Sequence, residues 1–498
     1  MINPDDDTKT GKPTTPSTTP AAVVPIRGGI NVDLGVSADD DSRIVLPESL
    51  TLEQMLKRFV HVSRGPMIVD IENTYRQLNP REFAAAYAHN TRQLEKGDKA
   101  IPVTKLWQNS PGRLSVDALG FHPGEGKFYR ESGVAYLNLW IPPSWPAMDP
   151  EDALEASQPF FDHLTYLIPD EVTRNDLIDW LAHATQDPDV RPHHHFLLIA
   201  PQEGTGRDLM VNILECLWGE RHAGFINLHD YMKGPHNEHM SGKILISVHE
   251  IKAPPREQWE YKERLKTLMT DDQININPKH KPMRTERFRA RLMMLANDEN
   301  ALPVSEGERR IYTGRCADQF KDEAYYKRLY GIYKDNRKRN HMLTGIWQLL
   351  RTRDLSKFNP GRRAPLNEMK RAMIAAGRSD EQSNAVEFAR KCPFDVVGSN
   401  DLIELLAPKL DNESQGDWQR RHGAIAAALR SVGCQRPEKK IWLNERSQRF
   451  WMLRNSVKWS TAATAVLHDQ AESARQFFAD YHNNLDDILA SWGNGDYE

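Results

Sequence analysis

The segment HFLLIAPQEGTGRD, residues 195–208, has the residue types of a phosphate-binding loop. Its apolar run at 196–199 predicts a buried strand, and the glycine turn at 204–206 precedes apolar residues at helical spacing. In such a layout, backbone N–H groups and a helix N-terminus hold phosphate oxygens. The predicted phosphate contacts are Gly204, Thr205, Gly206, Arg207 and Asp208.

Three positions depart from the full loop pattern, which is Gly, four free positions, Gly, Lys, and then Ser or Thr. Pro201 replaces the first glycine, Arg207 the lysine and Asp208 the hydroxyl residue. Arg207 keeps the positive charge, but as a broad planar fork instead of a compact ammonium. The carboxylate of Asp208 could bind Mg²⁺ or repel phosphate. Loss or slowing of nucleotide hydrolysis is therefore an open alternative.

A second apolar run, KILISVHE at 243–250, predicts a core strand that ends in a carboxylate. Phosphoryl transfer uses acids at such a strand end to hold Mg²⁺ through water and to orient the attacking water. Glu250 is the predicted acid for both roles, and His249 stands where a metal-linked Asp is expected. Imidazole suits Mg²⁺ poorly, because this ion prefers hard oxygen ligands. The alternative is a plain core strand that ends in His-Glu.

A third apolar run, RLMMLAN at 291–297, also ends in a polar residue, and an arginine pair follows it. The Asn297 amide could contact a γ-phosphate or position water by hydrogen bonding. Arg309 and Arg310 carry guanidinium groups that suit the charge of a transferring phosphoryl group in a neighbouring subunit. An arginine pair taken alone is more often solvated surface.

The composition is that of a globular protein with several domains. The chain has 498 residues, 39% hydrophobic and 27% charged, with a net charge of −4. This balance gives no general attraction to nucleic acid, so such binding needs a local basic patch. No apolar stretch approaches the ~18 residues of a membrane span, and four separated cysteines favour reduced thiols. We expect a cytoplasmic protein that makes no membrane contact.

Periodicity and turn signals divide the chain into six parts. The first is rich in Thr, Pro and Asp and is predicted to be disordered. The predicted parts are this tail (1–45), an α+β accessory domain (46–148), a helical collar (149–192), an α/β core (193–320), a helical extension (321–358) and a C-terminal domain (359–498).

The C-terminal domain has the outline of a winged helix. A helical pattern at 418–431 precedes strand-like runs at 439–443 and 449–453, joined by the turn 444–446. The predicted phosphate contacts are Arg436, Lys439, Lys440 and Arg446, with Arg449 and Arg454. Aromatic residues of the hairpin could stack on bases, although core packing is their commoner role: Trp442, Phe450 and Trp451.

Taken in order, these motifs resemble the helicase part of phage- and plasmid-type primase-helicases, the superfamily-three group of AAA+ proteins. The resemblance spans residues 107–313, about two fifths of the chain, and rests on FLLIAPQEGTGRD, ILISVHE, LKTLMTDDQININPKHKP, RLMMLAN and GERRIY. It implies an AAA+ P-loop core in a homo-oligomeric ring, usually a hexamer, that binds ATP and Mg²⁺ between subunits and threads single-stranded DNA.

The resemblance also implies a β-hairpin before the Asn strand, with a basic tip in the ring's pore. The residues at this position are Lys279, His280, Lys281 and Arg284. Their charges suit sequence-independent contacts to backbone phosphates. The alternative is a solvated basic loop.

Two functions remain open. The first is a replicative DNA helicase, with Glu250 as base, Asn297 as γ-phosphate sensor and an arginine finger acting between subunits. The second is a non-hydrolysing DNA-binding ring or scaffold that recruits replication proteins. The region before residue 146 is short for a priming module, so we expect a separate primase or polymerase as partner.

Overall fold

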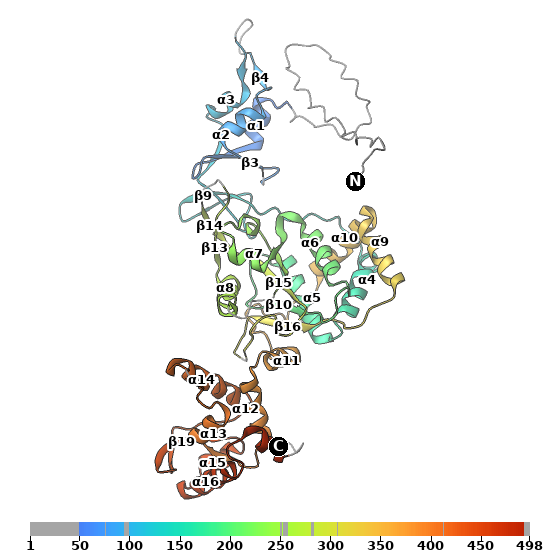
Figure 1. The fold of residues 1–498 in the computed structure, drawn as a ribbon. Helices are drawn as coiled ribbons and strands as arrows, with labels where there is room; N and C mark the ends of the chain where they lie inside the picture. The colour runs from blue at the N-terminus through green and yellow to red at the C-terminus, as the bar shows by residue number, and fades with distance from the viewer. Residues whose placement is uncertain are drawn as a thin grey trace, which may run out of the picture. The chain divides into compact units, whose positions relative to one another are not determined.

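The computed structural model describes residues 49–74, 76–93, 99–249, 251, 257–279, 283–305, 307–411 and 413–492 (Figure 1). The tail predicted to be disordered lies outside these residues, and so do Glu250, His280 and Lys281. The chain divides into two compact units. One comprises Met1–Leu119 and Glu131–Tyr136, and the other comprises Gly120–Arg130 and Leu137–Glu498.

The first unit is a small α+β fold around an aromatic core. Its helices are α1 (Leu52–Arg58), α2 (Pro80–Ala86) and α3 (Val103–Gln108), and its strands are β1 (Phe59–Val62), β2 (Met67–Asp70), β3 (Gln77–Leu78), β4 (Thr91–Arg92), β5 (Ile101–Pro102) and β6 (Leu114–Val116). Four strands form a sheet of order β3-β2-β1-β6. Thr51 and Gln54 form a capping box at the start of α1.

Three further strands lie where the chain passes between the units: β7 (Ala118–Gly120), β8 (Phe128–Glu131) and β9 (Val134–Asn138).

The second unit is built on a five-stranded parallel sheet. Its strands are β10 (His195–Ile199), β11 (Ala223–Asn227), β12 (Leu245–His249), β15 (Arg291–Ala296) and β16 (Ile311–Arg315). Their order is β11-β12-β15-β10-β16. Every residue of β10 and β15 is buried, as expected for parallel strands covered on both faces. The three strands predicted from apolar runs are thereby confirmed.

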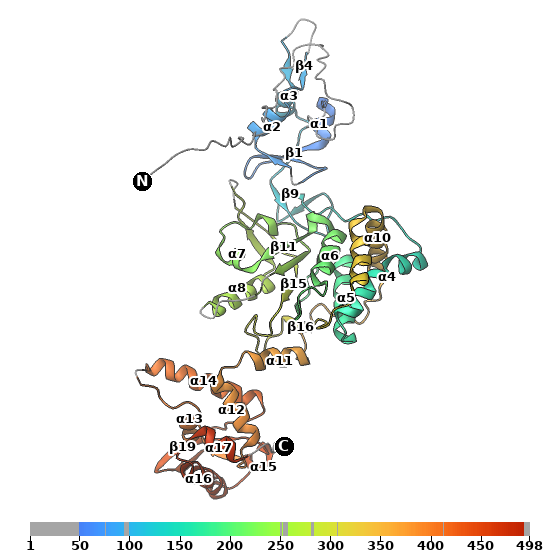
Figure 2. The ribbon, with the colours of Figure 1, turned by 45° about the vertical axis from the view of Figure 1, so that its right-hand side comes forward.

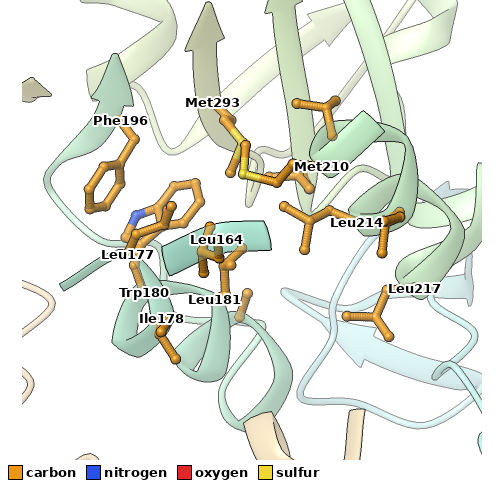
Figure 3. Packing of buried hydrophobic residues seen from close by; sticks show 14 of the residues in the cluster. Leu164, Leu177, Ile178, Trp180, Leu181, Phe196, Met210, Leu214, Leu217 and Met293 are labelled. Carbon is orange, nitrogen blue, oxygen red and sulfur yellow. The ribbon is translucent and has the colours of Figure 1, made fainter. Parts of the chain in front are cut away.

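One face of this sheet is covered by helices that come before, within and after the strands in the sequence. They are α4 (Pro150–Leu167), α5 (Glu171–Gln186), α6 (Arg207–His222), α9 (Glu323–Lys334) and α10 (Asn336–Thr352). Figure 2 shows α4, α5, α6 and α10 side by side. In Figure 3, Leu164, Trp180 and Met210 meet Phe196 and Met293 in one hydrophobic cluster. The segments predicted as collar and extension therefore share a core with the sheet.

The helices α4 and α10 approach each other closely. A Cβ atom on Gly345 would lie 2.7 Å from the carbonyl oxygen of Ala153, so the contact needs a glycine.

The other face of the sheet is covered by α7 (Leu228–Lys233), α8 (Gln258–Thr270) and α11 (Glu368–Ala376). A short helix, η1 (Glu238–Met240), precedes β12. The predicted hairpin before the Asn strand is confirmed as β13 (Gln273–Ile276) paired antiparallel with β14 (Arg284–Arg287). Between α10 and α11 the chain forms neither helix nor strand.

The C-terminal segment combines helices with a small antiparallel sheet. Its elements are α12 (Asp380–Lys391), β17 (Val396–Gly398), α13 (Ser399–Leu406), α14 (Gln415–Ser431), β18 (Lys440–Leu443), β19 (Arg446–Met452), α15 (Ser456–Ser460), α16 (Thr464–Asp480) and α17 (Leu485–Ser491). The sheet order is β17-β19-β18. Asn444 and Glu445 connect β18 to β19 with φ values of 50° and 56°, a left-handed turn that suits a tight hairpin. The predicted hairpin is confirmed.

None of the helices in the described ranges is long and apolar enough to span a bilayer.

Candidate functional site

The loop at 200–206 connects β10 to α6 through two glycines in the left-handed region. Gly204 has φ 83° and Gly206 has φ 89°, values that cost other residues conformational energy. A Cβ atom on Gly206 would also lie 2.7 Å from Cε1 of His163. Backbone strain and lack of space therefore both require glycine at this position.

His163, on α4, supports the loop from behind. Its Nε2 lies 3.0 Å from the Gly206 carbonyl oxygen, and its Nδ1 lies 2.9 Å from the Tyr325 hydroxyl. The carbonyl can only accept, so Nε2 carries the proton and Nδ1 accepts from tyrosine. Burial lowers the pKa of His163, which agrees with a neutral ring. Sequence reasoning missed this residue, because nothing in its local pattern links it to a loop 43 positions away.

Arg207 reaches across the carboxyl edge of the sheet. Its Nη1 donates to the Ala296 carbonyl at 2.7 Å, and its Nη2 donates to Oδ1 of Asn297 at 3.0 Å. The Asn297 amide in turn donates to Oε1 of Glu203 at 3.0 Å. The structure thus brings the predicted residues Arg207 and Asn297 together and adds Glu203. The arginine side chain is only 16% exposed.

A polar cavity of about 390 Å³ lies at the mouth of the loop. It is lined by Ala200, Gln202, Glu203, Gly204, Thr205, Gly206, Arg207, Asp208, Leu209, Asn297 and Tyr330. All five predicted phosphate contacts therefore face one space.

The residues around this cavity fit a phosphate-bearing ligand. The Thr205 hydroxyl is buried, with the residue 1% exposed, and finds no hydrogen-bond partner in the described part of the chain. The N-terminus of α6 directs its dipole at the same space. The Asp208 carboxylate, 70% exposed, and Glu203 supply hard oxygens of the kind that Mg²⁺ prefers.

The strand predicted to deliver the acid pair ends at His249. Because β15 separates β12 from β10, His249 lies at the same sheet edge as the loop but about 10 Å from β10. Its ring makes a T-shaped contact with Phe225 at 6.0 Å between centroids. Glu250 lies outside the described residues, so its role stays a prediction. Within the described ranges, no group of three or more His, Cys, Asp or Glu could hold a metal ion.

The predicted arginine pair lies at the amino ends of the strands, opposite the glycine loop. The Arg310 carbonyl accepts from the backbone N–H of His195, the first residue of β10, whereas the loop follows the last residue of that strand. A five-residue strand separates the two ends by about 16 Å. Neither arginine can therefore act on the loop of its own chain.

The two arginines differ in their surroundings. The Arg310 guanidinium donates to the Thr270 hydroxyl at 2.9 Å and lies 3.5 Å from Glu308. Arg309 is exposed, and no side-chain hydrogen bond or ion pair holds it within the described ranges. Both border a cavity of about 420 Å³ that also contains Arg191 and Arg363. Arg309 is therefore the one positioned to reach another molecule.

The hairpin β13–β14 presents one described basic residue at its turn. Lys279 is exposed, and the base of the turn is anchored, since Asn277 donates its backbone N–H to Asn237 at 2.7 Å. Arg284 is instead held by Ser241 at 2.8 Å and by Glu286 at 3.4 Å. Its guanidinium therefore has structural partners, and among the described residues no such partner is seen for Lys279.

The predicted basic residues of the C-terminal domain also differ in whether other residues already hold their side chains. Lys440 and Arg446 are exposed. Lys439 donates to the Ala462 carbonyl at 3.1 Å, and Arg436 donates to the Ser399 hydroxyl at 3.0 Å. Arg454 forms an ion pair with Asp395 at 2.8 Å.

The three hairpin aromatics also differ. Phe450 and Trp451 belong to the core, and Trp442 is 65% exposed.

These observations describe an α/β protein whose parallel sheet carries a glycine loop and a polar cavity at its carboxyl edge. Residues 198–310 match the family described as "Family of unknown function (DUF5906)". The chain is 24% identical over 230 residues to the "DNA Primase-polymerase" of Nitratiruptor phage NrS-1, over 45% of this chain and 31% of that protein. It therefore spans about a third of the length of this relative.

The fold is similar to solved structures of the C-terminal region of NrS-1. An apo structure of that region matches with a TM-score of 0.53 at 14% identity, over 79% of this chain and 95% of the other. A second, A-form apo structure matches with a TM-score of 0.55 at 14% identity, over 81% and 98%. At this identity the likeness shows a shared fold.

Proposed function

We propose that the chain is the motor subunit of a homo-oligomeric ring, a hexamer by resemblance, that uses ATP to move along single-stranded DNA during phage-type replication. The observation that carries this proposal is the separation of two half-sites on one sheet. The glycine loop and Asn297 lie at the carboxyl edge, and the exposed Arg309 lies at the amino edge. Head-to-tail contact between identical subunits would bring the half-sites together and close a ring.

In this proposal the loop N–H groups and the N-terminus of α6 bind the terminal phosphates of ATP. Asn297 contacts the γ-phosphate, and Glu250, at the end of the acid strand, orients and deprotonates the attacking water. Arg309 of the neighbouring subunit stabilises the charge that develops on the transferring group. Mg²⁺, held by Asp208 and Glu203 directly and by Glu250 through water, would neutralise phosphate charge.

Arg207 plays a double role in the proposed cycle. Before nucleotide binds, it holds Asn297 through the contacts described above. Phosphate oxygens would compete for the same guanidinium, since a charged acceptor forms the stronger hydrogen bond. Release of Asn297 would then follow phosphate binding.

The same contacts favour a second candidate function, a ring that binds DNA and recruits replication proteins without hydrolysis. If Arg207 stays on Asn297, the arginine and the amide are both withheld from the γ-phosphate. The two candidate functions differ in what Arg207 does once nucleotide is present.

The proposed DNA path has two parts. The hairpin turn with Lys279, His280, Lys281 and Arg284 faces single-stranded DNA in the ring, and the C-terminal segment acts as a winged helix with Arg436, Lys439, Lys440 and Arg446 on phosphates. The phage relative is a DNA primase-polymerase. We propose that a separate chain supplies those activities to this motor in the cytoplasm of the host.

The test is steady-state ATP hydrolysis with and without single-stranded DNA, using two variants and their mixture. Asn297→Ala removes the sensor of one half-site, and Arg309→Ala removes the other half-site. Each is expected to be inactive alone, whereas random mixing in equal amounts restores about one site in four. Activity of Arg309→Ala alone, or a mixture as inactive as its parts, would refute the shared site. Inactive wild type with active Arg207→Lys would favour the non-hydrolysing candidate.

A further inference from the structure

We propose that the solvent face of the β18–β19 hairpin binds nucleic acid, with Trp442 stacked on an unpaired base. This inference rests on the proposed DNA-binding role of the C-terminal segment and extends it to a specific contact. It does not depend on ATP hydrolysis.

The pairing register defines the solvent face. Lys440 pairs with Arg449, and Trp442 pairs with Ser447. Directly opposed residues of an antiparallel pair point to the same side, so these four side chains share one face. The intervening residues Ile441 and Leu443 are buried with Phe450 in a cluster that includes Leu467 of α16. The inner face is thus used mainly for packing.

Trp442 is not needed by that core. Among the tryptophans whose side chains the structure describes, only Trp442 is largely exposed, whereas Trp107, Trp180 and Trp451 are completely buried. A large aromatic side chain in water forgoes the stabilisation that burial would bring. An exposed tryptophan ring between cationic side chains is available to stack on a flat ligand.

The charge around Trp442 selects the kind of ligand. Residues 430–458 contain eight Lys and Arg but only two Glu, in a chain of net charge −4. Lys440 and Arg449, on the same face as Trp442, are exposed and are not engaged in ion pairs within the described residues. A ligand that offers both anions and flat apolar surfaces matches this face, and nucleic acid has phosphates and bases in that combination.

The aromatic contact also selects the form of nucleic acid. Bases inside a duplex are already stacked on their neighbours, so a tryptophan ring can stack only on an unpaired or terminal base. We therefore infer a preference for single strands or duplex ends over closed duplex. The cations on the same face would contact the flanking phosphates.

The experiment measures the Kd of the full chain for a labelled oligothymidylate and for closed circular duplex DNA. Trp442→Ala is expected to weaken binding of the single strand about 5-fold to 100-fold and to leave the closed duplex unchanged. Trp442→Phe should keep most of the affinity, because phenylalanine still stacks. Phe225→Ala is the matched control, since Phe225 is 66% exposed on β11 and should not alter binding.

Salt dependence separates stacking from charge. Trp442→Ala should keep the slope of log Kd against log salt for the single strand, whereas Lys440→Ala with Arg449→Ala should reduce it by about 1.4, which is about 0.7 for each lost phosphate contact. Unchanged single-strand affinity in Trp442→Ala overturns the proposal. An equal loss of affinity for closed duplex also overturns it. A variant that loses self-association but still binds DNA would assign Trp442 to a protein contact and overturn it as well. ATP hydrolysis measured without DNA tests the motor separately, so either proposal can fail alone.

Discussion

The guanidinium of Arg207 donates to the side-chain oxygen of Asn297 at 3.0 Å, although the two residues are 90 positions apart. Adjacent pairing of β10 and β15 makes the contact possible, because Asn297 directly follows β15 and Arg207 begins α6 after the loop that follows β10. The residue at the usual lysine position of a phosphate loop thus holds the residue at the usual sensor position. In the proposed motor, ATP would compete for this contact.

Arg207→Lys is expected to keep the positive charge while releasing Asn297. A lysine cannot bond two acceptors in the planar fork geometry of arginine. Removing a hydrogen bond to a charged group changes free energies by about 1.5–3 kcal/mol, so we expect turnover to rise about 10-fold. Steady-state hydrolysis at saturating ATP measures this. A lysine variant slower than wild type would show that the guanidinium fork itself is needed at the phosphate.

Arg309→Ala and Arg310→Ala should separate catalysis from stability. Arginine fingers contribute about 10³-fold or more to kcat, and we expect a loss on this scale for Arg309→Ala with an unchanged Tm. Arg310 is bound to Thr270 and Glu308, so Arg310→Ala should instead cost about 1 kcal/mol of stability. Turnover and thermal unfolding of both variants test the assignment. The reverse pattern would move the finger to Arg310.

Gly206→Ala should weaken nucleotide binding, with an affinity loss of at least about 10-fold. The new Cβ would meet Cε1 of His163 at 2.7 Å and would also strain a backbone with φ 89°. Gly433→Ala is the matched control, since Gly433 has φ 91° and no atom within 4 Å of an added Cβ. It should cost about 1 kcal/mol of stability and leave binding of a fluorescent ATP analogue unchanged. Equal nucleotide affinities in the two variants would count against the loop.

Lys279→Ala is expected to weaken single-strand binding uniformly across sequences. Loss of one phosphate contact lowers the slope of log Kd against log salt by about 0.7 between about 50 and 200 mM salt. Lys57→Ala serves as control, because Lys57 is exposed and pairs with Glu53. A slope equal to that of the control would remove the hairpin turn from the DNA path.

Acidification should destabilise the protein through buried His183. Its Nδ1 accepts from the Arg291 guanidinium at 2.9 Å, and burial together with that positive charge lowers its pKa from 6.5 to about 4. Above pH 6.5 the ring is neutral in both states. Between pH 6.5 and about pH 4, His183 binds a proton mainly in the unfolded chain, so the free energy of unfolding decreases as pH falls.

The expected loss for this histidine is on the order of 2 kcal/mol between about pH 7.5 and about pH 5. His183→Gln keeps an acceptor for Arg291 and should remove this part of the pH dependence. Urea unfolding at both pH values checks it. A variant with the same pH dependence as wild type would assign the effect to other buried groups, such as His194, whose pKa burial also lowers to about 4.

The elements themselves could be predicted from local sequence. Buried parallel strands need continuous apolar runs, and β10, β12 and β15 have them. The hairpin β18–β19 follows from alternation, and the pattern Lys-Ile-Trp-Leu at 440–443 already places Trp442 on the face of Lys440. These signals were readable because they depend only on neighbours along the chain.

Only the tertiary structure decided which side chains meet. Strand order places Asn297 beside the loop and His249 two strands away. Parallel pairing of β16 with β10 places Arg309 near the amino ends of the strands, opposite the loop. His163 supports Gly206 only because α4 packs against the sheet together with α6. A single sequence contains the strands but not their order, since that order depends on how separate apolar surfaces bury one another. The residue types of the site were therefore predictable, and their partners were not.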